Sequence, residues 1–219
     1  MAFDFEQARF NMIEQQVRPW EVLDKTVLEV LKNVPREAFV PEDKLTYAFS
    51  DMALPIGHGE VMMPPVVEGR MLQALALQSG DAVLEIGTGT GFMTACMASL
   101  AASVHSVDIH ADFIESAQQR LNALNVCNVR LEVGDAHESW DTGNRFDVIA
   151  ITGALSTDPI AYMQQLTVGG RLFCIVGAPP AMQAKLITRV TEDQFVTDAL
   201  FETCLPWLKG AEPKPRFEF

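Results

Sequence analysis

The sequence predicts a doubly wound α/β fold with a mostly parallel sheet, and three observations support this. From Gly80 onward, short apolar runs typical of buried strands alternate with segments of helical period. The first of these runs, at 82–86, leads into a helical segment through glycines at every second position. No such run precedes residue 79. Strands that alternate with helices imply right-handed crossovers and hence parallel pairing.

Residues 1–78 are predicted to form a helical cap that ends in a lid loop, in front of a sheet domain at 79–219. Apolar residues between positions 4 and 17 recur near helical period, and Pro19 ends that pattern. A second helix begins after Asp24, a residue type that caps helix N-termini, and stops at Pro35. A third helix is expected over about 65–77. We expect both parts to form one compact unit.

Within the sheet domain, the pattern predicts strands at 82–86, 103–107, 129–133, 146–151 and 171–176. Helices are expected at 93–101, at about 112–124, and from an Asp158 N-cap and Pro159 to Gly169 and Gly170. Residues 184–208 alternate between apolar and polar types around a turn at 192–194. This is typical of an antiparallel hairpin, here added to the sheet edge. The tail from Lys209 is expected to be extended, with a mobile end.

The charge balance of the 219 residues is acidic, with 16 Lys and Arg against 29 Asp and Glu and a net charge of −13. Binding to nucleic acid draws on clustered basic residues, and no Lys/Arg run occurs here, so we expect no nucleic-acid partner. The N-terminus lacks the basic and apolar regions of a signal peptide, and no apolar run approaches the roughly 20 residues that span a bilayer. We therefore expect no membrane partner and a cytoplasmic location.

The cysteines are expected to be free thiols in a reducing compartment. They are far apart, at Cys96, Cys127, Cys174 and Cys204, and none belongs to a C-x-x-C pair. The four histidines show no ligand spacing with them. The sequence therefore predicts no metal site.

The glycine-rich stretch Gly87, Gly89 and Gly91 follows the strand at 82–86 directly. Glycine reaches backbone angles closed to other residues and lets a ligand lie against the main chain. The spacing does not fit the G-x-G-x-x-G turn of dinucleotide-binding folds. With Glu85 ahead of the first glycine, it is similar to the first motif of class I S-adenosylmethionine methyltransferases, which have a Rossmann-like fold. Taken alone, the stretch also fits a tight strand-to-helix turn without a ligand.

Three further side chains are expected at the carboxyl ends of the strands, where ligands bind in open α/β sheets. Asp108 lies about 20 residues past the glycines, as a carboxylate that accepts from ribose hydroxyls should. Asp135 can accept from the exocyclic amine of adenine, and Thr152 would lie near the sulfonium. Asp108 by itself would also fit a solvated loop acid or a helix cap.

The segment 54–65 is rich in glycine and proline and precedes the first strand of the sheet. We expect little regular structure in it. It would act either as a lid over the carboxyl end of that strand or as a connecting loop without ligand contact.

Over nearly its whole length the chain resembles the protein-L-isoaspartate O-methyltransferase family. The matching segments are Arg9-x-x-Met12-x-x-x-Gln16, Val34-Pro-Arg-Glu-x-Phe-Val-Pro-Glu42, Leu54-Pro-Ile-Gly-His-Gly59 and Glu85-Ile-Gly-Thr-Gly-Thr-Gly91. The resemblance implies a cytosolic enzyme of protein repair that uses S-adenosyl-L-methionine to methylate the α-carboxyl of isoaspartyl residues in damaged proteins. It also implies that residues 56–65 cover the methyl group.

The resemblance assigns cofactor roles to specific positions. The expected cofactor-binding residues are His58, Gly59, Met62, Glu85, Gly87, Thr88, Gly89, Gly91, Asp108, Ile109, Asp135, Ala136 and Thr152. Of these, Glu85 and the three glycines would shape the turn, and His58 to Met63 would close the site.

Two segments on the acceptor side depart from the family pattern. Met63 stands where the family has a serine that faces the acceptor carboxylate, so it is the candidate catalytic position. Residues 203–206 keep only the proline of the family's C-terminal substrate strand. A carboxylate with a reference pKa of roughly 4 is already ionised near pH 7, so its methylation needs alignment and a dry site more than a base. Loss of the hydroxyl would weaken acceptor selection, unless Met62 and Met63 simply pack the lid.

We therefore interpret the chain as an S-adenosylmethionine-dependent carboxyl methyltransferase with a protein or peptide substrate. Two alternatives remain open. The first is a methyltransferase of the same fold with another acceptor, which both departures favour. The second is a non-catalytic S-adenosylmethionine-binding or interaction protein. The glycine spacing disfavours a nicotinamide-dependent oxidoreductase.

Overall fold

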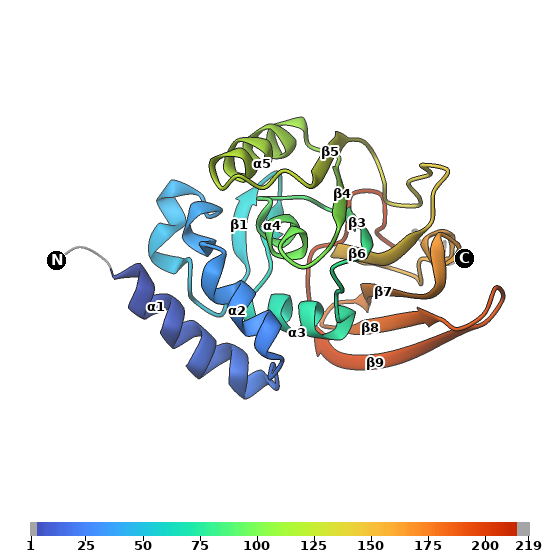
Figure 1. Cartoon of the computed structure of the whole chain (residues 1–219), viewed down its shortest axis with the longest axis horizontal. Coiled ribbons are helices and arrows are strands. Elements are labelled where there is room, and N and C mark those ends of the chain that lie inside the picture. Colours follow the sequence, from blue (N-terminus) through green and yellow to red (C-terminus); the bar gives the residue numbers. More distant parts are fainter. Residues whose placement is uncertain (1–3, 214–219) are drawn as a thin grey trace, which may run out of the picture.

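The protein is built around a seven-stranded sheet of order β5-β4-β3-β6-β7-β8-β9 (Figure 1). The computed structural model describes residues 4–213. The strands are β3 Ala82–Ile86, β4 Ser103–Asp108, β5 Val129–Val133, β6 Phe146–Leu155, β7 Leu166–Ala178, β8 Ala181–Arg189 and β9 Phe195–Thr203. Strands β3 to β7 pair in parallel, whereas β8 and β9 are antiparallel. The predicted parallel sheet and edge hairpin are confirmed.

The central strand β3 is the point from which the chain runs outward in both directions. After β3 the chain adds β4 and β5 on one side, and then crosses back to place β6 on the other side. This reversal is a topological switch point, where the loops beyond the carboxyl ends of two strands diverge and leave room for a ligand. The glycine-rich stretch follows β3 at this point.

Helices cover both faces of the sheet. Helices α4 Phe92–Ala98 and α5 Ala111–Ala123 connect β3 to β4 and β4 to β5, whereas α6 Ile160–Gln164 connects β6 to β7 in the opposite direction. Right-handed crossovers in opposite directions place their helices on opposite faces. Alternate residues of β3 follow this division, because Val83 packs with the α4 side and Leu84 packs with the α6 side.

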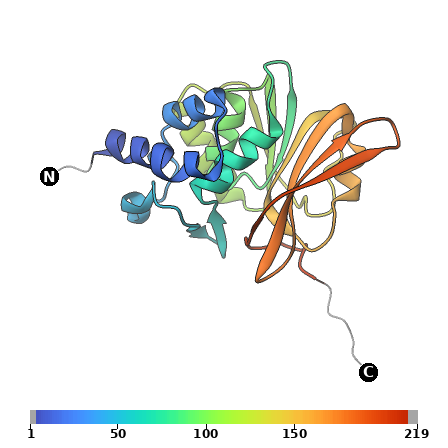
Figure 2. The ribbon, with the colours of Figure 1, turned by 90° about the horizontal axis from the view of Figure 1, so that it is seen from below.

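The N-terminal part is helical, as predicted. It comprises α1 Phe5–Met12, which continues through η1 Ile13–Val17 and η2 Arg18–Trp20, then α2 Lys25–Asn33, η3 Arg36–Ala38, η4 Glu42–Tyr47 and α3 Pro65–Leu75. The Asp24 carboxylate caps α2 by accepting from the amides of Thr26 and Val27. In both ribbon views α1 begins on the side of the molecule away from β8 and β9 (Figures 1 and 2). At the other end of the helical part, Trp20 and Arg70 of α3 contact the ring of Phe201 in β9.

The helical cap and the sheet share one hydrophobic core. A single cluster of buried side chains includes residues of α2, α3, α4 and β3, and the rings of Phe39 and Phe92 meet edge to face at 5.7 Å across this boundary. The shared core is consistent with one compact unit. The division into parts at residue 78 stays a prediction.

Three local expectations differ from the structure. The lid segment is ordered as a hairpin, β1 Leu54–Gly57 and β2 Glu60–Met62, hereafter the lid hairpin. Helix α6 ends at Gln164, because the chain from Leu166 already pairs with β6, and Gly169 and Gly170 therefore lie within β7. The Asp158 side chain does not cap α6; it pairs with Lys185 of β8 at 2.8 Å, a partner that only the tertiary fold supplies.

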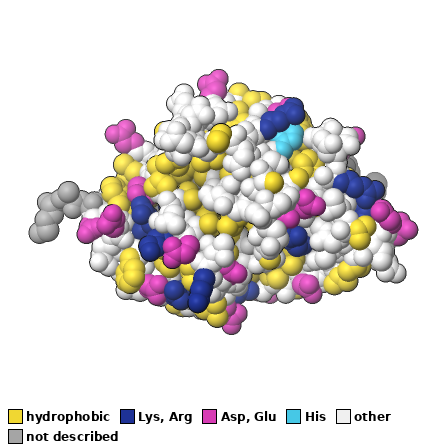
Figure 3. Space-filling model, viewed as in Figure 1, with side chains coloured by type: hydrophobic (Ala, Val, Ile, Leu, Met, Phe, Trp, Pro, Cys, Tyr) yellow, Lys and Arg dark blue, Asp and Glu magenta, His cyan; other side chains and the backbone are white. Residues whose placement is uncertain are grey.

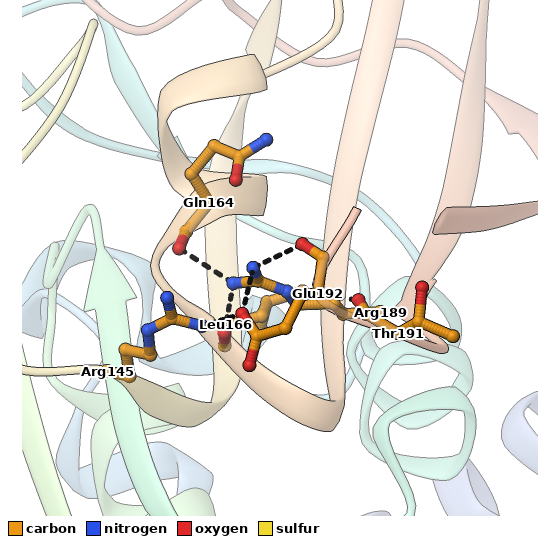
Figure 4. A network of polar contacts seen from close by, with 6 residues as sticks. All are labelled: Arg145, Gln164, Leu166, Arg189, Thr191 and Glu192. Atoms are coloured by element: carbon orange, nitrogen blue, oxygen red, sulfur yellow. Dashed lines mark hydrogen bonds and ion pairs between the residues drawn. The ribbon is translucent and has the colours of Figure 1, made fainter. Parts of the chain in front are cut away.

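Arg189 ties the end of the β8–β9 hairpin to the start of β7 (Figure 4). Its side chain is 2% exposed and donates to the carbonyl oxygens of Gln164, at 2.9 Å, and Leu166, at 2.8 Å. It also donates to the Glu192 carboxylate at 3.0 Å, and Arg145 reaches the same carboxylate at 3.2 Å. A buried guanidinium needs all of these acceptors, so the network fixes the hairpin on the sheet.

The surface carries both signs of charge in small groups. On the face shown in Figure 3, Lys and Arg side chains lie among Asp and Glu side chains and form no continuous basic band. Within residues 4–213, no helix combines the length and the apolar character needed to cross a membrane. The mobile end expected for the tail falls on residues 214–219, which lie outside the described part of the chain.

Candidate functional site

Two adjoining cavities lie beyond the carboxyl ends of β3, β4 and β6, at the switch point of the sheet. Seven of the expected cofactor residues line the first cavity: Gly87, Gly89, Asp108, Ile109, Asp135, Ala136 and Thr152. The expected residues Met62, Met63 and Thr88 line the second cavity. Gly87, Gly89 and Thr152 belong to both. Residues far apart in the sequence are thus brought to one edge of the sheet.

Only glycine fits at the first position of the turn, because the backbone there has a positive φ angle and a neighbouring side chain leaves no room for a Cβ atom. Gly87 has φ +96°, and a Cβ atom there would lie 2.3 Å from the Thr152 hydroxyl oxygen. That hydroxyl lies between the carbonyl oxygens of Ile86, at 3.0 Å, and Gly87, at 2.6 Å. Thr152 therefore fixes the turn from the end of β6. At Gly91, a Cβ atom would lie 2.9 Å from that of Ala117 in α5.

Asp108, the last residue of β4, faces the first cavity. Its two carboxylate oxygens accept from the backbone amides of Gly89, at 2.8 Å, and His110, at 2.9 Å. Burial raises the pKa of Asp108, and the two amide hydrogen bonds oppose that effect. Each carboxylate oxygen has two lone pairs, so two amide bonds leave acceptor capacity for hydroxyl groups of a ligand.

Asp135 follows β5 and also lines the first cavity. One oxygen, Oδ1, lies 2.7 Å from Nδ1 of His137, and this contact lowers the pKa of Asp135. The next residue after each acid also lines this cavity: Ile109, which is 41% exposed, and the buried Ala136. Tyr162 of α6 donates its hydroxyl to the Ala136 carbonyl and holds that loop in place. The first cavity is therefore lined by two carboxylates and by apolar side chains.

Glu85 lies beneath the turn and lines neither cavity. Its side chain is fully buried, and its Oε2 accepts from the hydroxyls of Ser106 and Thr94, both at 2.5 Å. The Ser106 hydroxyl also contacts that of Thr88 at 2.6 Å. Burial raises the pKa of Glu85 to about 8. This environment agrees with a role in shaping the turn, whereas contact with a ligand stays a prediction.

The strands of the lid hairpin line the first cavity, and its turn packs against the β4–α5 loop and the start of α5. His58, at φ +55° between Gly57 and Gly59, stacks on His110 with ring centroids 4.0 Å apart. Its Nε2 lies 2.9 Å from a carboxylate oxygen of Asp112, at the start of α5. His58 therefore fastens the lid hairpin, and neither His58 nor Gly59 lines a cavity.

The same contacts gather three groups that can ligate metals. Ligand atoms of His58, His110 and Asp112 lie within 4.8 Å of one another. Sequence spacing gave no sign of this cluster because His58 comes from the lid hairpin and the other two from the β4–α5 loop and α5. The hydrogen bond and ring stacking already account for the arrangement. The absence of a metal stays a prediction.

The two acceptor-side departures both lie at the cavities. Met63 is 4% exposed, and it packs in the main core cluster while also lining the second cavity. Leu205 and Pro206 line the first cavity, where the Pro206 carbonyl accepts from the Ala154 amide at 2.9 Å. Residues 204–208 thus run beside the end of β6.

Sequence reasoning missed several lining residues. Lys209 and Glu60 form an ion pair of 3.4 Å across the first cavity, and Leu208 and His137 add to its walls. The start of the tail, predicted only to be extended, therefore contributes to the site. No local pattern marks Lys209, because its partner lies in the lid hairpin.

Comparisons with known proteins place this chain in a family. The model of the protein-L-isoaspartate(D-aspartate) O-methyltransferase family matches residues 7–205. A protein-L-isoaspartate O-methyltransferase of Methylorubrum extorquens (strain PA1) is 39% identical over 88% of this chain and 84% of its own length. Protein-L-isoaspartate O-methyltransferase 1 of Rhodopseudomonas palustris (strain HaA2) is 34% identical over 98% of this chain and 91% of its own length.

Solved structures agree on the fold. One, from Plasmodium falciparum, is described as a protein-L-isoaspartate O-methyltransferase in complex with S-adenosyl-L-homocysteine. It superposes with a TM-score of 0.79 at 18% identity, and the match covers 94% of this chain and 98% of that chain. A second protein-L-isoaspartate O-methyltransferase has a TM-score of 0.79 at 23% identity and covers 95% of this chain and 67% of its own. On the family model and the sequence relatives, the chain belongs to the protein-L-isoaspartate O-methyltransferase family.

Proposed function

We propose that this protein transfers a methyl group from S-adenosyl-L-methionine to the carboxyl group of isoaspartyl residues in damaged proteins. The observation that carries the proposal is the Asp108 carboxylate, held over the glycine turn by the Gly89 amide at 2.8 Å and facing a cavity. An acid at the end of the second strand of such a fold is suited to a ribose. The curated relatives carry the corresponding activity in their names.

The residues of the first cavity fit an adenosine. Asp108 has lone pairs left for both ribose hydroxyls after its two amide hydrogen bonds. Ile109 offers an apolar surface to the base, and the Asp135 oxygen that His137 does not engage can accept from the adenine amine. Gly87 and Gly89 let the ligand lie against the main chain.

Methyl transfer to a carboxylate requires no proton transfer by the protein. When bound, S-adenosylmethionine supplies a methyl group on a positively charged sulfur. The acceptor carboxylate has a reference pKa of roughly 4, so it is ionised at neutral pH and needs no general base. The protein must align the two groups and exclude water. The lid hairpin, fastened by His58, and the buried Met63 serve that purpose.

A different acceptor is the second candidate, and Met63 favours it. This buried thioether lines the second cavity at the position of the family serine. An isoaspartyl carboxylate there would lack one hydrogen bond, worth about 1 kcal/mol. The candidate activity would be methyl transfer to another carboxylate or to a less polar small-molecule acceptor.

Two measurements test the proposal. In calorimetry, S-adenosylmethionine and S-adenosylhomocysteine should both bind, and failure of both to bind would refute the cofactor assignment. Transfer of radiolabelled methyl to an isoaspartyl peptide should exceed transfer to the same peptide with a normal aspartyl residue. Cofactor binding without turnover of either peptide would favour another acceptor or a non-catalytic role.

A cytoplasmic location is part of the proposal. The free cysteines support it: Cys96 and Cys174 are buried, and Cys127 and Cys204 are exposed. Exposed thiols persist in a reducing compartment. A fluorescent fusion found outside the cytoplasm would contradict this part.

A further inference from the structure

Glu68, in the first turn of α3, is a buried carboxylate with one oxygen left unsatisfied. Its side chain is 1% exposed, and Oε2 forms an ion pair with Arg36. The other oxygen, Oε1, is buried and has no hydrogen-bond partner among the residues that the structure describes. A buried carboxylate oxygen without a partner lowers the stability of the folded protein, so a bound ligand that donates to it would be favoured.

Arg36 holds this carboxylate rigidly. Its fully buried guanidinium also donates to the carbonyl oxygens of Ala48, at 2.7 Å, and Met63, at 2.8 Å, and lies over the ring of Phe92 at 4.9 Å. The pKa of Glu68 is raised from its ordinary value because burial outweighs the neighbouring Arg36 guanidinium, which opposes the rise. Because Arg36 stays protonated, it favours the charged form of its partner.

Glu68 lines the second cavity, which has a volume of about 40 Å³. A water molecule needs roughly 10–15 Å³, so the cavity admits a group larger than water. Among the described residues that line this cavity, Glu68 carries the only charged side chain, and the glycine turn also lines it. A cavity with one negative group and no positive one is suited to a cationic group of a ligand.

We infer that Glu68 binds the α-ammonium group of the methionine moiety of S-adenosylmethionine. The inference rests on the proposed function and assigns a residue to it. With the ribose at Asp108, the amino-acid end of the cofactor extends along Gly87 and Gly89, which line both cavities. An ammonium has only donors and a carboxylate only acceptors, so Oε1 of Glu68 gains the partner that it lacks.

The test compares two ligands on two proteins by calorimetry. The ligands are S-adenosylhomocysteine and its analogue with hydrogen in place of the α-amino group. The variant Glu68→Gln should bind S-adenosylhomocysteine about 10- to 100-fold more weakly than the wild type does, the range for a hydrogen bond to a charged group. Both proteins should bind the deaminated analogue equally.

Glu37→Gln is the matched control. Glu37 also pairs with an arginine, Arg9, and also has a buried oxygen without a partner, but it lines neither cavity. This variant should bind S-adenosylhomocysteine like the wild type. If Glu68→Gln does not fold, the double variant R36M/E68M removes both charges together, which avoids a lone buried charge. It should show the same selective loss for the ligand that carries the amino group.

The outcomes separate this inference from the proposed function. Equal binding of S-adenosylhomocysteine by the wild type and Glu68→Gln would overturn the inference and leave the proposed function intact. An equal loss for both ligands would also overturn it, because that result indicates a structural role. A wild type that binds neither ligand would overturn the proposed function and the inference with it.

Discussion

Replacing Gly87 by alanine tests how the glycine turn is held. The Cβ atom would lie 2.3 Å from the Thr152 hydroxyl and would sit on a residue with φ +96°. The backbone strain costs about 1–3 kcal/mol. Displacement of the hydroxyl from its carbonyl acceptors costs about 1 kcal/mol more. We expect Gly87→Ala to lower the free energy of unfolding by about 3 kcal/mol and Tm by roughly 6–12 °C.

The assay is urea unfolding followed by circular dichroism, with Gly169→Ala as the control. Gly169 has φ +85°, and a Cβ atom there would have no neighbouring atom within 4 Å, so this variant experiences the strain without the clash. Thr152→Ala removes the clashing oxygen and should cost about 1 kcal/mol by itself. Combined with Gly87→Ala, it should destabilise less than the sum of the single variants. Equal losses for the two glycine variants, together with strict additivity, would refute the reasoning.

Four further predictions concern the site and its surroundings. Asp108→Asn should weaken S-adenosylhomocysteine binding by about 10-fold or more in calorimetry, and unchanged affinity would exclude the ribose contact. The pKa of Glu85 is raised from 4.5 to about 8, so its contribution to stability is present below pH 4.5 and is lost as the pH rises through 8. Glu85→Gln should therefore flatten the fall in unfolding free energy between about pH 5 and 9, and an unchanged slope would contradict this. His58→Ala removes the stacking on His110 and the hydrogen bond to Asp112, so the lid hairpin should be cleaved faster in limited proteolysis; equal rates would argue against the fastening role. Met63→Ser should raise methyl transfer to the isoaspartyl peptide while lowering Tm, because a buried side chain is lost; an unchanged rate would count against its place in the acceptor site.

The strands were predictable because a buried parallel strand appears in the sequence as a short run of apolar residues. The predicted strand at 82–86 matches β3 Ala82–Ile86, and the one at 129–133 matches β5 Val129–Val133. Helix α6 was predicted too long, because the pairing of Leu166 with β6 prevailed over the glycines that signal a helix end. The lid hairpin was missed because glycine and proline signal a turn but do not encode its partner strand.

In the candidate site, too, residues marked by a local pattern could be predicted, whereas residues that depend on distant partners could not. Asp108, Asp135 and the glycine turn could be placed from the sequence, since a residue at the carboxyl end of a predicted strand must lie at the ligand-binding edge. Glu68 and Lys209 could not be placed, because each depends on a partner distant in the chain. Glu85 was recognised as part of the motif, but only the structure shows it buried beneath the turn.

By itself, the sequence determined the fold class, the family and the edge of the sheet at which the proposed cofactor cavity lies. The fold class and this edge follow from the periodicity of apolar residues and from the glycines after the first strand, and the family follows from the motifs that resemble it. The tertiary structure alone decided which groups face the two cavities and which are satisfied elsewhere. It pairs Arg36 with Glu68, which lines the second cavity, and leaves one oxygen of this carboxylate without a hydrogen-bond partner among the described residues. Local patterns do not encode such pairings, because burial and hydrogen bonding depend on segments that meet only when the chain has folded.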